Sequence, residues 1–148
     1  YIPDRKKEGY GPSIKSFKEL IKNGVKIIFT VDCGTLSFDA INYAKENKID
    51  VIVLDHHQSE INLPKAFSIV NPNRLDDKSN LQYLCAAGVT FMFLISVNRE
   101  LRLNKWFKLN NIKEVKSKKN FGVELWWNLK SHITMFWYLF AKTENFNV

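Results

Sequence analysis

The sequence predicts an α/β fold with a parallel sheet, because two continuous apolar runs each lead into a polar cluster and an amphipathic segment separates them. The runs are residues 25–31 and 49–54, and Asp32 and Asp55 follow them. Continuous β-branched runs are typical of strands that are covered on both faces of a parallel sheet. The intervening segment is long enough for one crossover helix, so both strands should end at the same edge.

The first predicted element is a helix that begins at residue 14. Ser13 can cap it and Gly24 can end it. Its apolar residues share one helical face: Ile14, Phe17, Leu20 and Ile21. The strand at 25–31 comes next.

The later elements follow the same alternation. A short amphipathic helix is predicted from Phe38 to Ala44, before the strand at 49–54. A third strand is predicted at 67–70, ahead of an Asn-Pro-Asn-Arg turn, and a helix is predicted at 84–101.

Length and composition indicate one intracellular domain. A chain of 148 residues can bury a substantial core. Its two cysteines form no closely spaced framework, which is typical of reduced, intracellular proteins. We find no signal sequence and no apolar run long enough to cross a membrane, so we expect a cytoplasmic location. The chain starts at Tyr1 and reads as a piece of a longer protein.

The net charge of +7 is concentrated in the last third of the chain. Residues 101–148 hold Arg102 and eight lysines against three glutamates, together with all four tryptophans. Three interpretations stay open: a second subdomain, a basic aromatic surface that binds nucleic acid, or a tail that is not native coding sequence.

The two strand ends offer ligands for a metal ion. Asp55, His56 and His57 follow one strand and Asp32 follows the other. Hard divalent ions such as Mn²⁺ accept mixed carboxylate and imidazole ligands. The alternatives are that Asp32 only caps the next helix and that the histidines are solvated loop residues. Zinc is less favoured, because it prefers thiolate or three-imidazole ligands and the third histidine, His132, is far away in the sequence. We expect Cys33 to be a packing residue rather than a nucleophile.

Five segments of the chain carry recognisable motifs. They are 2–13 (IPDRKKEGYGPS), 30–34 (TVDCG), 50–58 (DVIVLDHHQ), 69–74 (IVNPNR) and 84–91 (LCAAGVTF). In their order and spacing they resemble the DHH phosphoesterase superfamily, and the EGYG and NPNR sequences within them resemble the RecJ family of single-strand-specific 5′ to 3′ exonucleases. The resemblance runs from residue 1 to about residue 101.

The resemblance implies a two-metal site for Mn²⁺ or Mg²⁺, in which the ions clamp the attacking and leaving oxygens of a phosphodiester. The implied metal ligands are Asp32, Asp55, His56 and His57, and the implied catalytic residues are Asp32, His56 and His57. Asp32 would bridge the ions. Asp55 could instead orient an imidazole, and His57 could hold the scissile phosphate.

The resemblance also implies nucleic-acid contacts. Arg5 and Tyr10 lie in a segment that resembles the one that shapes the family's strand-binding groove; the alternative is an ordinary tight turn that leads into a helix. Arg74 would either reach a phosphate or pin its own turn. Single-stranded DNA is the implied partner, with single-strand-binding protein and a helicase as partners of the parent enzyme in DNA repair and recombination. No membrane is implied.

The chain departs from the family pattern at both ends. The upstream aspartate-rich motif is absent, and so is the later Leu-Gly-Thr motif with its metal-binding aspartate. We therefore interpret residues 1–101 as a partial DHH phosphoesterase catalytic domain, 102–120 as a lysine-rich linker and 121–148 as an atypical tail. With part of the ligand set missing, we expect little or no turnover from this chain alone.

Two other functions stay open. One is a DHH phosphodiesterase that acts on short oligonucleotides, cyclic dinucleotides or pyrophosphate. The other is a non-catalytic module that binds nucleic acid through its basic tail.

A shifted reading frame or a truncation near residues 115–120 would account for the change in composition there. We expect sequencing of the source DNA to find the Leu-Gly-Thr motif and its aspartate encoded in another frame. The absence of such a frame would contradict the hypothesis.

Overall fold

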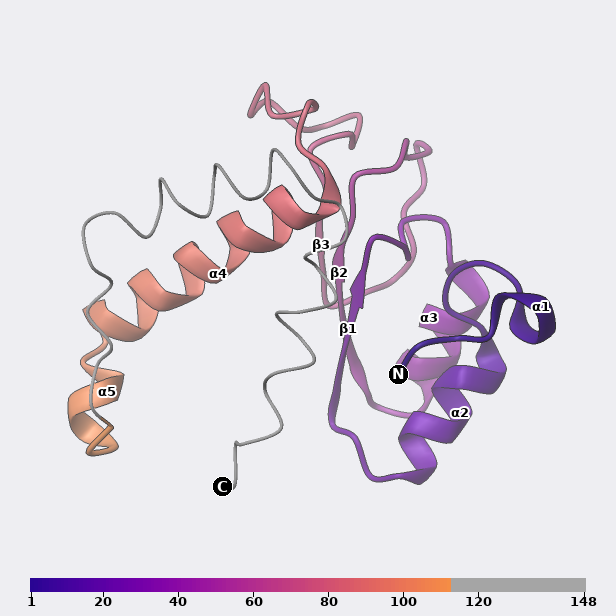
Figure 1. The fold of residues 1–148 in the computed structure, drawn as a ribbon, viewed down its shortest axis with the longest axis horizontal. Helices are drawn as coiled ribbons and strands as arrows, with labels where there is room; N and C mark the ends of the chain where they lie inside the picture. The colour runs from indigo at the N-terminus through magenta and orange to yellow at the C-terminus, as the bar shows by residue number, and fades with distance from the viewer. Residues whose placement is uncertain (113–148) are drawn as a thin grey trace. The chain divides into compact units, whose positions relative to one another are not determined.

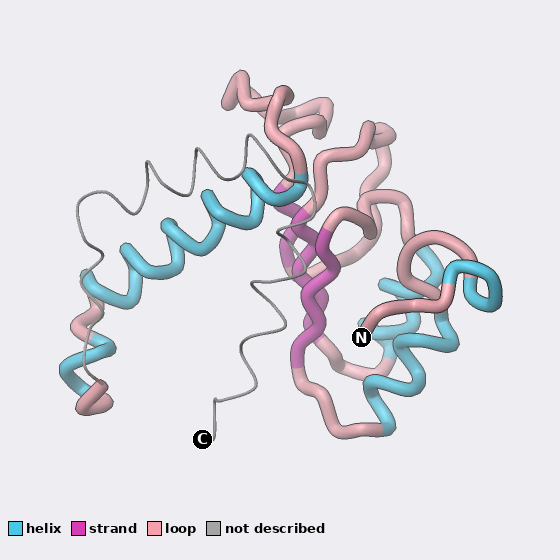
Figure 2. Tube along the Cα trace, viewed as in Figure 1, coloured by secondary structure: helices cyan, strands magenta, loops and turns pink. Residues whose placement is uncertain are grey.

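The computed structural model describes residues 1–112, and it confirms the predicted α/β class. The sheet has three strands, which lie side by side in Figures 1 and 2. The elements in chain order are α1 (Arg5–Glu8), α2 (Ile14–Lys22), β1 (Ile27–Val31), α3 (Phe38–Glu46), β2 (Asp50–Leu54), β3 (Ser68–Val70), α4 (Ala86–Leu103) and α5 (Trp106–Leu109). The predicted tail at 121–148 and the end of the predicted linker at 102–120 lie outside the described residues.

The chain divides into two compact units, residues 1–99 and 100–148. The first unit contains the whole sheet. The described part of the second unit consists of the end of α4 and the short helix α5. The boundaries of the predicted partial domain and linker stay a prediction.

The sheet has the order β1-β2-β3, and both pairings are parallel. Val31 pairs with Leu54, and Leu54 pairs with Val70. All three strands therefore end level with one another. The predicted crossover between the first two strands is confirmed.

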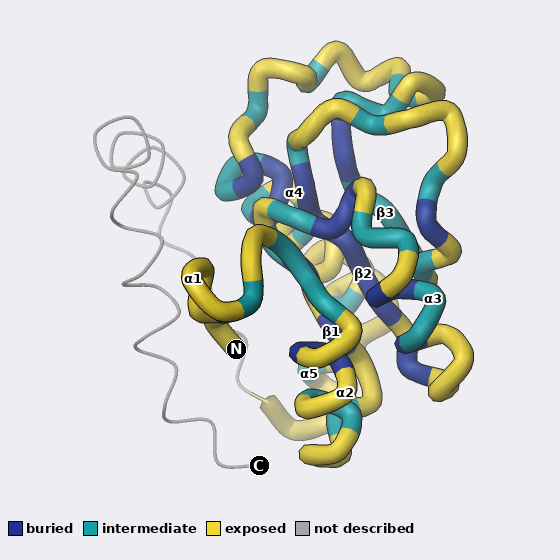
Figure 3. The backbone as a smooth tube through the Cα atoms, turned by 90° about the vertical axis from the view of Figure 1, so that its right-hand side faces the viewer, coloured by how far each residue is buried: buried dark blue, intermediate teal, exposed yellow. Residues whose placement is uncertain are grey.

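The core lies between the sheet and the helices α2 and α3 (Figures 1 and 3). Phe17 of α2, Ile41 of α3 and Ile28 of β1 are buried together there. The helix α2 forms where it was predicted, and Ser13 accepts a hydrogen bond from the Ser16 backbone N–H as its N-cap. Two short helices, α1 and α5, were not predicted.

The predicted coverage of both strand faces holds for β2 but is wrong for β1. Residues 51–54 of β2 are all buried, because β2 is the central strand. Ile27 and Phe29 of β1 are 44% and 47% exposed. Their face points away from the core of α2 and α3, and the ring of Phe93 in α4 lies near the ring of Phe29, with centroids 6.0 Å apart.

No helix among residues 1–112 is long and apolar enough to cross a membrane.

The turn after β1 requires glycine at position 34. Gly34 has a φ of +113°, which side chains rarely adopt, and a Cβ there would lie 2.5 Å from Thr30 Oγ1 and 3.2 Å from Val53 Cγ1. Thr30 Oγ1 is buried, and within the described part of the chain it has no hydrogen-bond partner. This close approach brings the end of β1 and the next turn together.

We therefore expect Gly34→Ala to lower the free energy of unfolding by about 2–4 kcal/mol, because the new methyl group meets buried atoms as well as a strained φ. Gly24→Ala is the matched control. Its φ is +83°, but nothing lies within 4 Å of the new Cβ, so only about 1 kcal/mol should be lost. Urea unfolding of both variants measures the difference, and equal losses would refute the steric explanation.

Candidate metal centre

Three polar residues stand side by side where the parallel strands end. They are Asp32, Asp55 and Asn71, each directly after its strand. The backbone ladder continues through the first two, since Asp32 N–H donates to Leu54 O at 3.0 Å and Asp55 N–H donates to Val70 O at 3.1 Å. In open parallel sheets ligands bind at this edge.

Asp55 is a buried carboxylate surrounded by hydrogen-bond donors. It is 1% exposed and accepts hydrogen bonds from the Thr35 hydroxyl at 2.7 Å and the Thr35 N–H at 3.0 Å. Its other oxygen contacts His57 Nδ1 at 2.6 Å and accepts from the His56 N–H at 2.8 Å. Burial alone would raise the pKa of Asp55, but the bonds from Thr35 and His57 leave this pKa below its usual value. Asp55 is therefore a carboxylate at neutral pH.

This carboxylate determines which nitrogen of His57 carries a proton. An ionised Asp55 can only accept, so the 2.6 Å contact requires a proton on Nδ1. The neutral imidazole then keeps a lone pair on Nε2. The second nitrogen is thereby left as an acceptor or a metal ligand.

Asp32 lies outside the sheet and faces solvent. Its φ is +62°, in the left-handed region that aspartate tolerates better than most residues, and its side chain is 62% exposed. One carboxylate oxygen lies 3.2 Å from His56 Nε2. The polar residues that follow β1 and β2 are therefore linked by this side-chain contact as well as by the pairing of the two strands.

Asp32, His56 and His57 form a group that could hold a metal ion, because one ligand atom from each lies within 4.8 Å of the others. Asp55 is not a member of this group. One of its carboxylate oxygens accepts hydrogen bonds from Thr35, and the other contacts His56 and His57. One carboxylate and two imidazoles suit a divalent transition ion such as Mn²⁺. A thiolate ligand is disfavoured, because burial and the nearby Asp55 and Asp32 raise the pKa of Cys33 to about 11.

The sequence did not predict the two asparagine side chains that hold the backbone of His56 and His57. Asn71 Nδ2 donates to His57 O and to Thr35 Oγ1, both at 2.8 Å. Asn73 Nδ2 donates to His56 O. The signal that could have identified both residues was their position in the turn that begins directly after a third parallel strand.

The residues predicted to contact nucleic acid lie in two places: Arg5 and Tyr10 near the metal group, and Arg74 in the turn after β3. Tyr10 joins the metal group, because its hydroxyl donates to Asp32 O at 2.8 Å and lies 3.3 Å from His57 Nε2. The Arg5 guanidinium lies over the Tyr10 ring, 5.5 Å from its centroid. Desolvation and the nearby Asp32 raise the pKa of Tyr10, so the phenol stays protonated at neutral pH.

Arg74 lies in the turn after β3. It donates from Nε to Asp76 at 2.9 Å and from a terminal nitrogen to Ile69 O at 2.9 Å, and it forms an ion pair with Asp76. These contacts match the alternative in which Arg74 pins its turn. Binding of a phosphate by Arg74 stays a prediction.

Comparisons with known proteins agree on one family. Residues 1–117 match the family model described as the DHH family, N-terminal domain. The single-stranded-DNA-specific exonuclease RecJ of Haemophilus influenzae is 39% identical over 101 residues, which cover 68% of this chain and 18% of that protein. RecJ of Escherichia coli is 35% identical over 111 residues, with 75% and 19% covered. The chain spans a fifth or less of the length of these curated relatives.

Two solved structures are similar as well. The crystal structure of exonuclease RecJ bound to manganese has a TM-score of 0.59 and 31% identity, and the match covers 68% of this chain and 25% of that one. The crystal structure of RecJ from Thermus thermophilus in complex with Mn²⁺ has a TM-score of 0.50 and 28% identity, with 60% and 13% covered.

The buried carboxylate should make stability depend on pH. Because the pKa of Asp55 is lowered on folding, its ionised form stabilises the fold above the unfolded pKa of about 4, and this contribution is lost as pH falls through the folded value. Asp55→Asn presents an amide to donors, so we expect it to lower the free energy of unfolding by about 2–4 kcal/mol at pH 7 and by less at pH 3.

Urea unfolding in EDTA at both pH values measures this effect. The matched control is Asp50→Asn, which removes an exposed carboxylate from the opposite end of β2 and should change stability by less than about 0.5 kcal/mol. An Asp55→Asn loss of equal size at both pH values would show that the charge of Asp55 is not the cause.

Proposed function

The chain belongs to the DHH family, and we propose that it forms part of a metal-dependent exonuclease that degrades single-stranded DNA from the 5′ end. The observation that carries the proposal is the approach of Asp32, His56 and His57 to within 4.8 Å at the carboxyl edge of the sheet. The RecJ relatives and the two manganese-bound structures support it. The setting we propose is DNA repair and recombination in the cytoplasm.

The residues present fit a divalent ion. Asp32 supplies an exposed carboxylate, and His57 supplies a lone pair on Nε2 because Asp55 holds the proton on Nδ1. His56 Nε2 points at the Asp32 carboxylate and would be the third ligand. Mn²⁺ or Mg²⁺ bound there would neutralise phosphate charge and activate a water molecule for attack on phosphorus.

Other residues of the chain position and orient the proposed metal ligands. Asp55, Asn71 and Asn73 hold the two histidines through one side chain and two backbone carbonyls. Catalytic roles fall to Asp32, His56 and His57, which are the groups exposed to a substrate. In this arrangement Asp55 acts as the residue that orients His57, the alternative to direct ligation that the sequence left open.

The substrate surface in this proposal is the N-terminal segment that carries Arg5, in α1, and Tyr10, which follows that helix. A guanidinium over an aromatic ring offers both a phosphate contact and a stacking face. Arg74 would contribute only if it released Asp76. Single-strand-binding protein and a helicase are proposed partners of the parent enzyme alone.

We expect Mn²⁺ to bind this chain saturably in calorimetry, and His56→Ala or Asp32→Asn to weaken binding by at least about tenfold, because each removes a ligand. Asparagine keeps the left-handed φ of Asp32 accessible, so that variant tests the charge without adding backbone strain. His132→Ala, which removes the third histidine of the chain, is the matched control and should bind as the wild type does. Absence of Mn²⁺ binding by the folded wild type would contradict the proposed site.

An assay with end-labelled single-stranded DNA and Mn²⁺ tests turnover separately. We expect little or no nucleotide release from this chain, since the group found among the described residues offers three ligand atoms, fewer than a pair of metal ions needs. Release that His56→Ala abolishes would overturn that expectation and support the site. A preference for dinucleotides would favour the short-substrate phosphodiesterase, and metal-independent binding with a steep salt dependence would favour the binding module.

A further inference from the structure

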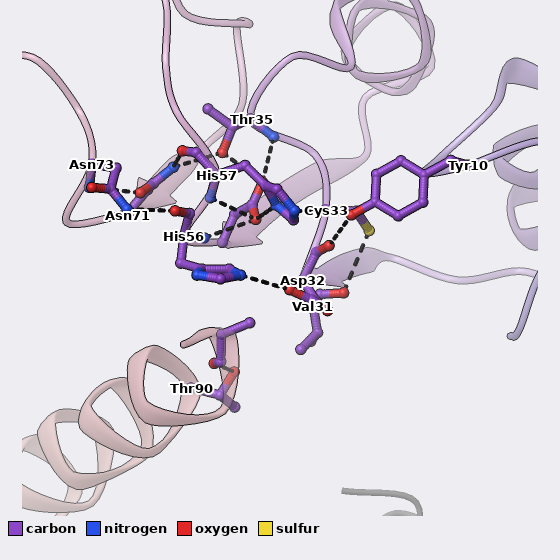
Figure 4. A network of polar contacts seen from close by, with 12 residues as sticks. Tyr10, Val31, Asp32, Cys33, Thr35, His56, His57, Asn71, Asn73 and Thr90 are labelled. Atoms are coloured by element: carbon purple, nitrogen blue, oxygen red, sulfur yellow. Dashed lines mark hydrogen bonds and ion pairs between the residues drawn. The ribbon is translucent and has the colours of Figure 1, made fainter. Parts of the chain in front are cut away.

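The Tyr10 hydroxyl lies between two of the proposed metal ligands (Figure 4). It donates to the backbone carbonyl of Asp32 at 2.8 Å and lies 3.3 Å from Nε2 of His57. The ring also contacts the imidazole edge to face, with centroids 6.0 Å apart and an interplanar angle of 75°. One hydroxyl thus touches residues from the ends of both β1 and β2.

The single proton of this hydroxyl cannot serve both neighbours. Because Asp55 holds the proton of His57 on Nδ1, Nε2 can only accept, as can the Asp32 carbonyl. The hydroxyl oxygen is closer to the Asp32 carbonyl than to Nε2, at 2.8 Å against 3.3 Å. Tyr10 therefore donates its hydroxyl proton mainly to the Asp32 carbonyl. The Nε2 lone pair therefore remains available to a cation, with the Tyr10 oxygen beside it.

The Asp32 backbone needs support at this point. It has a φ of +62°, and its N–H is already held by Leu54 O. Tyr10 holds the carbonyl on the other side of the same residue. Both peptide groups of Asp32 are thereby fixed, and the exposed carboxylate projects from a backbone that cannot rotate freely.

We propose that Tyr10 is a positioning residue whose hydroxyl, rather than its ring, sets the divalent-cation affinity of the Asp32 and His57 pair. This inference rests on the proposed function. The inference connects the Arg5 and Tyr10 segment, which is proposed to hold the DNA strand, with the geometry of the metal ligands. The same side chain then contributes to strand binding through its ring and to metal binding through its oxygen.

Tyr10→Phe removes the hydroxyl and keeps the ring. We expect the variant to bind Mn²⁺ about tenfold more weakly than the wild type in calorimetry, in line with other residues that orient metal ligands. Tyr10→Leu should weaken Mn²⁺ binding to the same extent, because both lack the oxygen. Tyr83→Phe is the matched control: Tyr83 is 77% exposed, and its variant should bind as the wild type does.

Urea unfolding in EDTA separates positioning from a loss of fold. Tyr10→Phe should unfold within about 1 kcal/mol of the wild type, since only one partly exposed hydrogen bond is lost. Wild-type Mn²⁺ affinity in Tyr10→Phe would overturn the inference, even if Tyr10→Leu bound weakly, because the ring would then be responsible. If His56→Ala abolished binding in the same experiment, the proposed metal site would still stand. A wild type that binds no Mn²⁺ would overturn both.

Discussion

The parallel register of the three strands is the constraint on which the candidate site depends. Val31, Leu54 and Val70 pair in a row, so the next residue of each chain segment emerges at the same edge. A slip of one residue would turn every side chain of the shifted strand to the other face of the sheet and would separate the aspartates. The one-sided burial of β1 opposes such a slip, because the buried Ile28 would exchange environments with the exposed Ile27 and Phe29.

The two aspartates occupy equivalent positions after adjacent strands, yet they have opposite environments. Asp55 follows the central strand and is buried among donors, where its charge orients His57. Asp32 follows the edge strand, and its left-handed backbone directs the carboxylate to solvent near His56. A buried charge costs desolvation energy, which the bonds from Thr35, His56 and His57 offset. One carboxylate thus organises the site and the other is exposed to a ligand.

Much of the fold followed from local patterns. The amphipathic helix at α2, its serine cap and the three apolar strands were all predicted, because each depends on residues close together in the chain. The exposed face of β1 was not, since a continuous apolar run looks the same whether one face of its strand is covered or both. The supporting roles of Thr35 and Asn71 were missed for a related reason: their partners are 20 and 36 residues distant.

The motifs TVDCG and VLDHH already specified which ligand types stand at the strand ends, and they also identified the family. They did not reveal that Asp55 faces inward, that Asp32 faces outward, or that the Tyr10 hydroxyl reaches a carbonyl 22 residues away. Strand and helix periodicity can be predicted from sequence because they are local properties of the chain. Burial and hydrogen-bond partners are set by which segments pack together, and that depends on the whole core.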